Sequence, residues 1–209
     1  MKPIVHLTTA IAAVLVIGCS SSTDGGGGTT RPPSDLNFLR FAPTAPALCS
    51  NSVTFDATKG VDVEAALQFP EPGHPADCSG GTEDFVRLRI DKESLLELPD
   101  GTPLNDGDVV SITMTWVGGD SIMVQLEPTG LKFNPAKPAE LKIEYGEASD
   151  DLNHNGTVDA EDEAIEQELG LWRQATLADP FELIGSIKLE DTNEFEAELN
   201  GFSRYAIAY

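Results

Sequence analysis

Side chains able to bind a metal ion are concentrated in one twelve-residue stretch, DLNHNGTVDAED, which runs from Asp151 to Asp162. Oxygen-bearing residues recur there at alternate positions around Gly156, where the chain can turn sharply. Alternate residues of a tight loop point to the same side, so their oxygens can converge on one centre. Calcium is a hard cation that takes about six to eight oxygen ligands. We therefore predict a Ca²⁺ site formed by Asp151, Asn153, Asn155, Thr157, Asp159 and Asp162.

The spacing is that of the EF-hand calcium loop, whose first three ligands bind the ion directly through their side chains. Thr157 would contribute its backbone carbonyl, and Asp159 would bind the ion directly or through a water molecule. Asp162 would cap the site from the start of the following helix. An aspartate at this last position, in place of the usual glutamate, resembles the loops of dockerins and other exported calcium-binding modules.

Two alternatives compete with a calcium site: an acidic turn without an ion, and a magnesium site. Residues 146–170 contain nine acidic residues and no Lys or Arg, so without a cation their charges repel one another. Magnesium demands a stricter octahedral arrangement. His154 falls at an outward-pointing position, where we expect it at the surface. The chain has one such loop and no amphipathic helix before it, so we expect the ion to order the loop rather than to operate a sensor.

The elements that must position this loop are mostly strands. Apolar and polar residues alternate over residues 86–90, 111–116, 122–126 and 141–145, a period typical of half-buried strands. Turn signals such as Asn105-Asp106-Gly107 and Gly118-Gly119-Asp120 separate these segments. Further strands are predicted over residues 171–174, 181–189, 194–199 and 204–208. The spacing predicts a mainly β fold, an antiparallel β-sandwich.

One segment, from Ala160 to Leu169, has the pattern of a helix. Ile165 and Leu169 lie four residues apart, the first turn is acidic, and Gly170 provides a stop. The segment directly follows the metal-binding stretch. We therefore predict a calcium loop and a short helix inserted into the sandwich at residues 147–170.

Two flanking stretches support the fold through a resemblance. LEPTGLKFNPAKPAELKIEY, residues 126–145, is similar to a signature of bacterial β-sandwiches akin to the spectrin-binding domain of ankyrins and netrin receptors. The closing GFSRYAIAY resembles the last strand of those modules, although Gly201 stands where they usually have histidine. The resemblance covers about residues 84–209. It implies a β-sandwich with an interaction role, and it supplies no catalytic residues.

The beginning of the chain predicts export and a lipid anchor. Residues 7–18, LTTAIAAVLVIG, carry no charge and are too short to span a membrane, which suits a signal peptide. The sequence Val16-Ile17-Gly18-Cys19 resembles the bacterial lipobox, which implies cleavage before Cys19 and lipid on its thiol. We therefore predict a lipoprotein signal peptide at residues 1–18. A disordered, Gly/Ser-rich tether would follow at 19–35, and one folded domain at 36–209.

Charge and cysteine content restrict the possible partners and the cellular compartment of the protein. Without residues 1–18 the chain has 12 Lys and Arg against 35 Asp and Glu, a net charge of −23, which excludes nucleic acid as a partner. Cys49 and Cys78 form an even pair in an exported chain, so we predict a disulfide between them. Its loop would stabilise the fold by about 3.5 kcal/mol in the chain-entropy model.

No catalytic motif of the HExxH, GxSxG or P-loop type occurs, and His74 lies alone in a Pro/Gly-rich loop. We expect a monomeric, calcium-binding lipoprotein of the cell envelope, on the outer membrane in a diderm organism. The lipid on Cys19 would attach the protein to the membrane. We expect a role in adhesion, envelope structure or protein interaction. One alternative is a polysaccharide-binding module using Trp116 and Trp172, and another is a two-carboxylate hydrolase.

Overall fold

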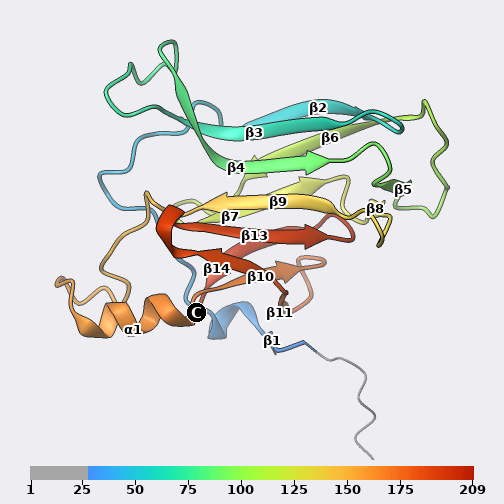
Figure 1. Ribbon diagram of the computed structural model, residues 1–209. Coiled ribbons are helices and arrows are strands. Elements are labelled where there is room, and N and C mark those ends of the chain that lie inside the picture. Colours follow the sequence, from blue (N-terminus) through green and yellow to red (C-terminus); the bar gives the residue numbers. More distant parts are fainter. Residues whose placement is uncertain (1–27) are drawn as a thin grey trace, which may run out of the picture.

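The computed structural model describes residues 28–209 and shows two antiparallel sheets packed face to face (Figure 1). The predicted sandwich is therefore confirmed. The seven-stranded sheet has the order β1 (Thr30–Arg31), β11 (Phe181–Leu183), β10 (Gly170–Gln174), β14 (Arg204–Ala208), β7 (Met123–Glu127), β6 (Val109–Trp116) and β2 (Ser52–Thr58). The five-stranded sheet has the order β12 (Ile187–Leu189), β13 (Glu194–Leu199), β9 (Ala139–Glu144), β4 (Thr82–Ile90) and β3 (Val63–Pro70). A small ribbon of β5 (Leu95–Glu97) and β8 (Lys132–Phe133) lies at one end.

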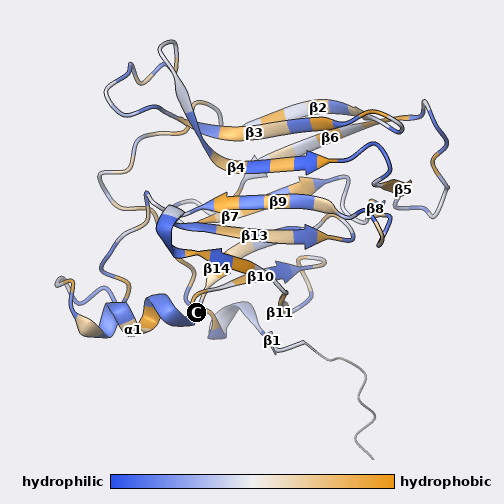
Figure 2. Cartoon of the chain, viewed as in Figure 1, coloured by the Kyte–Doolittle hydropathy of each residue, from blue (hydrophilic) through white to orange (hydrophobic). Residues whose placement is uncertain are grey.

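The core lies between the sheets because one side of each strand is apolar. Along β4, Val86 and Leu88 are fully buried while the arginines between and after them point outward. Leu88 lies opposite Leu141 of β9, which is also fully buried. Figure 2 shows the resulting alternation of hydrophobic and hydrophilic residues along β4 and β9. The period-two pattern thus separates the side chains that face the core from those that face solvent.

A second apolar cluster covers part of the outer face of the seven-stranded sheet. Trp172 and Phe181 pack there against Leu36, which precedes the first long strand. The following residues run beside the sheet, since the Leu39 N–H donates to the Ile207 carbonyl at 2.9 Å and the Ile122 N–H to the Leu39 carbonyl at 2.8 Å. The N-terminal segment is therefore part of the fold.

The folded part begins earlier than the sequence suggested. The segment 19–35 was expected to be a disordered tether, yet β1 pairs with β11 and residues Pro33–Asp35 form a 3₁₀ turn. The Arg31 guanidinium also lies 5.4 Å from the centre of the Trp172 ring. Backbone pairing and this cation–π contact order a stretch that has no apolar side chain to bury.

Residues 181–189, predicted as one strand, form two. β11 belongs to the seven-stranded sheet and β12 to the five-stranded sheet, and residues Ile184–Ser186 cross between them. Gly185 lies in this crossing with open space around it. The strands β2 and β3 were not predicted, although burial alternates along β2. The two strands face each other across the edge of the sandwich.

The predicted disulfide between Cys49 and Cys78 is present, with a Cα–Cα distance of 5.9 Å. It ties the segment before β2 to the hairpin between β3 and β4. The backbone adds to this link, because the Cys49 N–H donates to the Gln68 carbonyl at 2.8 Å.

The predicted insert connects the two sheets. Residues 145–169 leave β9 in the five-stranded sheet and arrive at β10 in the seven-stranded sheet. They contain α1 (Ala160–Glu168), the single α-helix in the described part of the chain. No helix within residues 28–209 combines the length and apolar character needed to cross a bilayer.

Candidate calcium site

The root of the loop is fixed by both ends of the folded chain. The Ser149 N–H donates to the Arg40 carbonyl at 2.8 Å, so the N-terminal segment holds the approach to the loop. Leu152, the second residue of the loop, is buried in the core, and its carbonyl accepts the Tyr209 hydroxyl at 2.6 Å. The start of the loop is therefore anchored to the folded core, although most of the loop is exposed.

Within the loop, side-chain oxygens accept backbone N–H groups a few residues ahead. The two carboxylate oxygens of Asp151 accept from the Asn155 N–H at 3.0 Å and the Gly156 N–H at 2.9 Å. The Asn153 side-chain oxygen accepts from the Asn155 N–H at 2.9 Å. The Asn155 oxygen accepts from the Thr157 N–H at 2.8 Å and the Thr157 hydroxyl at 2.6 Å. These bonds curl the chain tightly through the first seven residues of the loop.

The backbone at the turn explains the glycine. Gly156 has φ +88°, a left-handed conformation that strains other residues. His154 also has positive φ, at 57°, and its side chain is exposed. The expectation of a surface histidine at this position is therefore confirmed.

The end of the loop merges with the start of α1. Asp159 is the helix N-cap, with its side chain accepting from the Glu161 N–H at 2.8 Å. Asp162 completes a reciprocal capping box, because its Oδ2 accepts the Asp159 N–H at 2.9 Å. The helix begins here because two of its free N–H groups and the N-cap amide find acceptors in these carboxylates.

Asp162 does more than cap the helix. Its Oδ1 also accepts the N–H groups of Leu152 at 2.8 Å and Asn153 at 3.1 Å, so one carboxylate joins both ends of the loop. The residue is buried, and the hydrogen bonds from the Asp159 and Asn153 amides lower the pKa of its carboxyl group. The side chain is thereby held as a carboxylate at the base of the loop.

The predicted ligands therefore occupy two levels. Asp151, Asn153, Asn155, Thr157 and Asp159 follow one another along the exposed turn, whereas Asp162 lies beneath it. Within residues 28–209 no three His, Cys, Asp or Glu side chains are gathered as a metal cluster, so the three loop aspartates do not meet at one point. A cation in the turn would depend on amide and backbone oxygens as well as on carboxylates.

The donor set fits a calcium ion by its chemistry. All of its atoms are hard oxygens, and a carboxylate oxygen that accepts one N–H keeps a further lone pair. Each oxygen of Asp151 accepts one N–H and so keeps a lone pair for an ion. Oδ2 of Asp159 is also free to bind, since its one contact is a long one of 3.4 Å with the Thr157 hydroxyl. The Asn155 oxygen would have to release the Thr157 hydroxyl in order to bind an ion.

Two residues outside the loop support it, and sequence reasoning missed both. The Lys188 ammonium on β12 donates to the Glu166 carbonyl at 2.6 Å, near the end of α1, which has no basic residue in its last turn. A cation there offsets the negative end of the helix dipole. Tyr209 holds the other side, and burial together with the charge of Asp162 raises its pKa. Both residues are distant from the loop in sequence, so no local pattern marks them.

The tryptophans proposed for sugar stacking are engaged in the structure. Trp172 is buried and its indole N–H donates to the Ala208 carbonyl at 3.0 Å. Trp116 is half-buried, lies 5.5 Å from the Phe41 ring and donates to the Ser121 carbonyl at 2.8 Å. Neither ring forms an open platform for a sugar.

The carboxylate whose pKa is raised furthest in the described chain is Glu144, on the outer face of the five-stranded sheet. Burial raises its pKa to about 7, and neighbouring carboxylates add to the effect. Glu194 lies directly opposite on β13, and the cavity beside the pair measures about 30 Å³. A space of this size does not admit a sugar ring.

His74, in the disulfide-linked hairpin, lies 3.6 Å from the exposed Glu71 carboxylate.

No protein-family model matches this chain, and comparisons with curated proteins and with solved structures likewise give no match. The resemblance to ankyrin and netrin-receptor sandwiches stays a prediction. Residues 1–18 and Cys19, predicted as signal peptide and lipid anchor, lie outside the described residues.

Proposed function

We propose that this protein is an exported lipoprotein, anchored through Cys19, whose β-sandwich carries one structural calcium site in the loop from Asp151 to Asp162. Its role would be adhesion, envelope structure or protein interaction. The observation that best supports the calcium site is the turn itself, where side-chain oxygens of Asp151, Asn153 and Asp159 each retain a free lone pair within one twelve-residue loop. The ion is hard, and so are these ligands.

Charge gives the site its second support. The nine acidic residues of 146–170 have no Lys or Arg in the same segment. Within the described residues the one ion pair made by α1 is the contact of Glu166 with Lys188, at 3.6 Å. A divalent cation near Asp151 and Asp159 would relieve repulsion at the opposite end of the insert.

The direct test is calorimetry on the mature chain, with Cys19→Ser to keep it soluble. One Ca²⁺ should bind, with an affinity in the range of exported sites, about 10⁻⁴–10⁻³ M or tighter. Asp151→Asn should weaken binding by at least about 10-fold, because it removes the negative charge and one of the two oxygens that could bind the ion, while the other oxygen can still accept a backbone N–H. Asp150→Asn, an equal change of charge just before the loop, is the matched control. Equal calcium binding by Asp151→Asn and Asp150→Asn would disprove the site.

Asp162→Asn is a less selective variant. Because this carboxylate accepts three backbone amides, its loss would disorder the loop in the absence of calcium as well. Melting curves with and without calcium separate the two effects. Asp151→Asn, which loses one of two N–H acceptors, should lower stability more with calcium than without it, whereas Asp162→Asn should lower it in both conditions.

The anchor has its own test, independent of calcium. Cells producing the full chain are labelled with a fatty acid that carries a chemical handle. The label should be incorporated by the natural sequence and be lost in Cys19→Ser, with the protein passing into the soluble fraction. Labelling that survives Cys19→Ser would exclude this residue as the lipid attachment site.

A further inference from the structure

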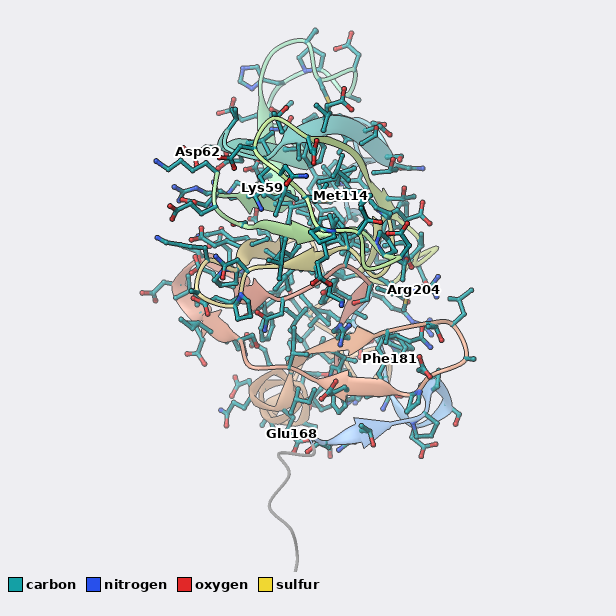
Figure 3. All side chains as sticks on the ribbon, turned by 90° about the vertical axis from the view of Figure 1, so that its right-hand side faces the viewer. Lys59, Asp62, Met114, Glu168, Phe181 and Arg204 are labelled. Carbon is teal, nitrogen blue, oxygen red and sulfur yellow. A yellow bond between two sulfur atoms is a disulfide. The ribbon has the colours of Figure 1, made fainter. Side chains whose placement is uncertain are left out.

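A row of polar side chains crosses the outer face of the seven-stranded sheet, far along the chain from the calcium loop. Gln174 of β10 and Gln125 of β7 are the direct cross-strand neighbours of Arg204 on β14. The Arg204 Nε donates to the Gln125 side-chain oxygen at 3.3 Å, and the Gln125 amide donates to the Thr129 hydroxyl at 3.0 Å. Figure 3 labels Arg204 at the margin of the molecule, on the side of this sheet. The row is therefore held in place from strand to strand.

The row forms the floor of a groove with a volume of about 330 Å³. One wall is the hairpin loop after β10, where Gln174 donates to the Asp179 carbonyl at 2.9 Å and Leu177 is 72% exposed. The other wall is the end of β7 with Thr129. The groove thus offers amides, hydroxyls, one guanidinium and an apolar rim.

Arg204 lacks the partner that its surroundings lead one to expect. The protein has 35 acidic residues, yet within residues 28–209 Arg204 makes no ion pair. Its one side-chain hydrogen bond there goes to Gln125, which leaves most of its five N–H donors unused by the protein. Burial lowers the pKa of the guanidinium, as expected for a cation partly removed from water without a counter-charge.

The chemistry of the groove limits the ligand. A guanidinium fork matches a carboxylate through two parallel N–H donors. The groove also contains the carboxylate of Glu127, so its one cation is already balanced in charge and suits a monoanion better than a doubly charged phosphate. Gln125, Thr129 and Thr176 add groups that bind hydroxyls. The groove lies on the face of a sheet and offers no free strand edge, which disfavours an extended peptide.

We propose that the groove over Arg204 binds the carboxylate of an acidic sugar, with Arg204 pairing to the carboxylate and the glutamine and threonine side chains contacting the hydroxyls. This site is separate from the calcium loop and does not depend on it. It also does not require the two tryptophans.

The test is an NMR titration of the mature chain carrying Cys19→Ser, with glucuronate, glucose and inorganic phosphate as probes. Glucuronate should shift the signals of Gln125, Gln174 and Arg204, and glucose and phosphate should bind at least about 10-fold more weakly. Arg204→Gln should weaken glucuronate binding by about 10-fold or more. Glu127→Gln should strengthen it several-fold, since it removes the carboxylate that repels the ligand.

Arg89→Gln is the matched control, because Arg89 lies on the other sheet and pairs with Glu140 at 3.5 Å. Its glucuronate binding should equal that of the natural chain. Equal binding of glucose and glucuronate, or unchanged binding in Arg204→Gln, would overturn the proposal. Preferential binding of phosphate would overturn the assignment to a sugar acid. The gain expected in Glu127→Gln keeps the idea testable even if Arg204→Gln unfolds, because absence of that gain contradicts it.

Discussion

Glu144 provides a quantitative test of the electrostatics of this acidic sandwich. The residue ends β9, and burial is the first cause that raises its pKa to about 7. The positive groups nearby are committed elsewhere: Lys142 pairs with Glu194 and Glu196, and Arg87 pairs with Asp84. The carboxylates that further raise the pKa belong to Glu83, Glu194, Asp84 and Glu147.

The sign of the effect follows from proton binding. The pKa is about 7 in the folded chain and 4.5 in the ordinary unfolded state, so the folded chain binds the extra proton between these values. Stability therefore falls as the pH rises through this window, and ionised Glu144 destabilises the fold above pH 7. The full pKa difference of about 2.5 units corresponds to at most about 3–4 kcal/mol. Because the carboxyl group is partly exposed and screened by water, we expect a cost of about 1 kcal/mol.

Glu144→Gln should remove this cost. The variant should melt about 2–4 °C above the natural chain at pH 8 and close to it at pH 4.5, in metal-free buffer. Glu140→Gln is the control on the same strand, because Glu140 forms an ion pair with Arg89 and should gain no stability at pH 8. If Glu144→Gln gave the same shift at both pH values, or lowered the melting temperature at pH 8, the reasoning would be refuted.

Three further predictions concern the supports of the calcium loop and the fold. Tyr209→Phe removes the hydroxyl that bonds the buried Leu152 carbonyl, so the free energy of unfolding should fall by about 1 kcal/mol and calcium should bind more weakly; unchanged calorimetry and melting would contradict this. Gly156→Ala forces a side chain into positive φ and should cost about 1 kcal/mol, visible as weaker calcium binding, whereas His154→Ala should leave affinity unchanged. The double change of Cys49 and Cys78 to serine should lower stability by about 3 kcal/mol, seen as a lower midpoint in urea; an equal midpoint would show that the link is not stabilising.

The features that the sequence predicted are those whose physics is local. The alternation along β4 is a property of neighbouring residues, and the spacing of the calcium loop lies within twelve positions. Asp162 is predicted to lie at the start of the helix, and the structure places it there as the third residue of α1. Its burial beneath the turn, with three amides on one carboxylate, could not be inferred, because it depends on how the loop folds back on itself.

The features that were missed depend on distant partners. Residues 30–35 have the composition of a tether, and only the edge of β11, some 150 residues later, gives β1 a strand to pair with. Lys188 and Tyr209 support the loop from other strands for the same reason. The division of residues 181–189 did have a local signal in Gly185, which marks the crossing between sheets. The alternation in β2 was likewise present, as Val53 and Phe55 show.

The candidate calcium loop lies at the same end of the sandwich as β1, which follows the proposed lipid anchor in the chain. Figure 1 shows β1, α1 and the C-terminus at one end of the sandwich and the hairpin between β3 and β4 at the other. If Cys19 carries lipid, the nine peptide links to Gly28 reach at most about 30 Å, which keeps the α1 end near the membrane. That end holds the acidic insert, which anionic headgroups on the membrane surface would repel. A calcium ion in the loop would reduce this repulsion, so the ion would influence how the anchored domain is oriented, with the disulfide-linked hairpin pointing away from the membrane.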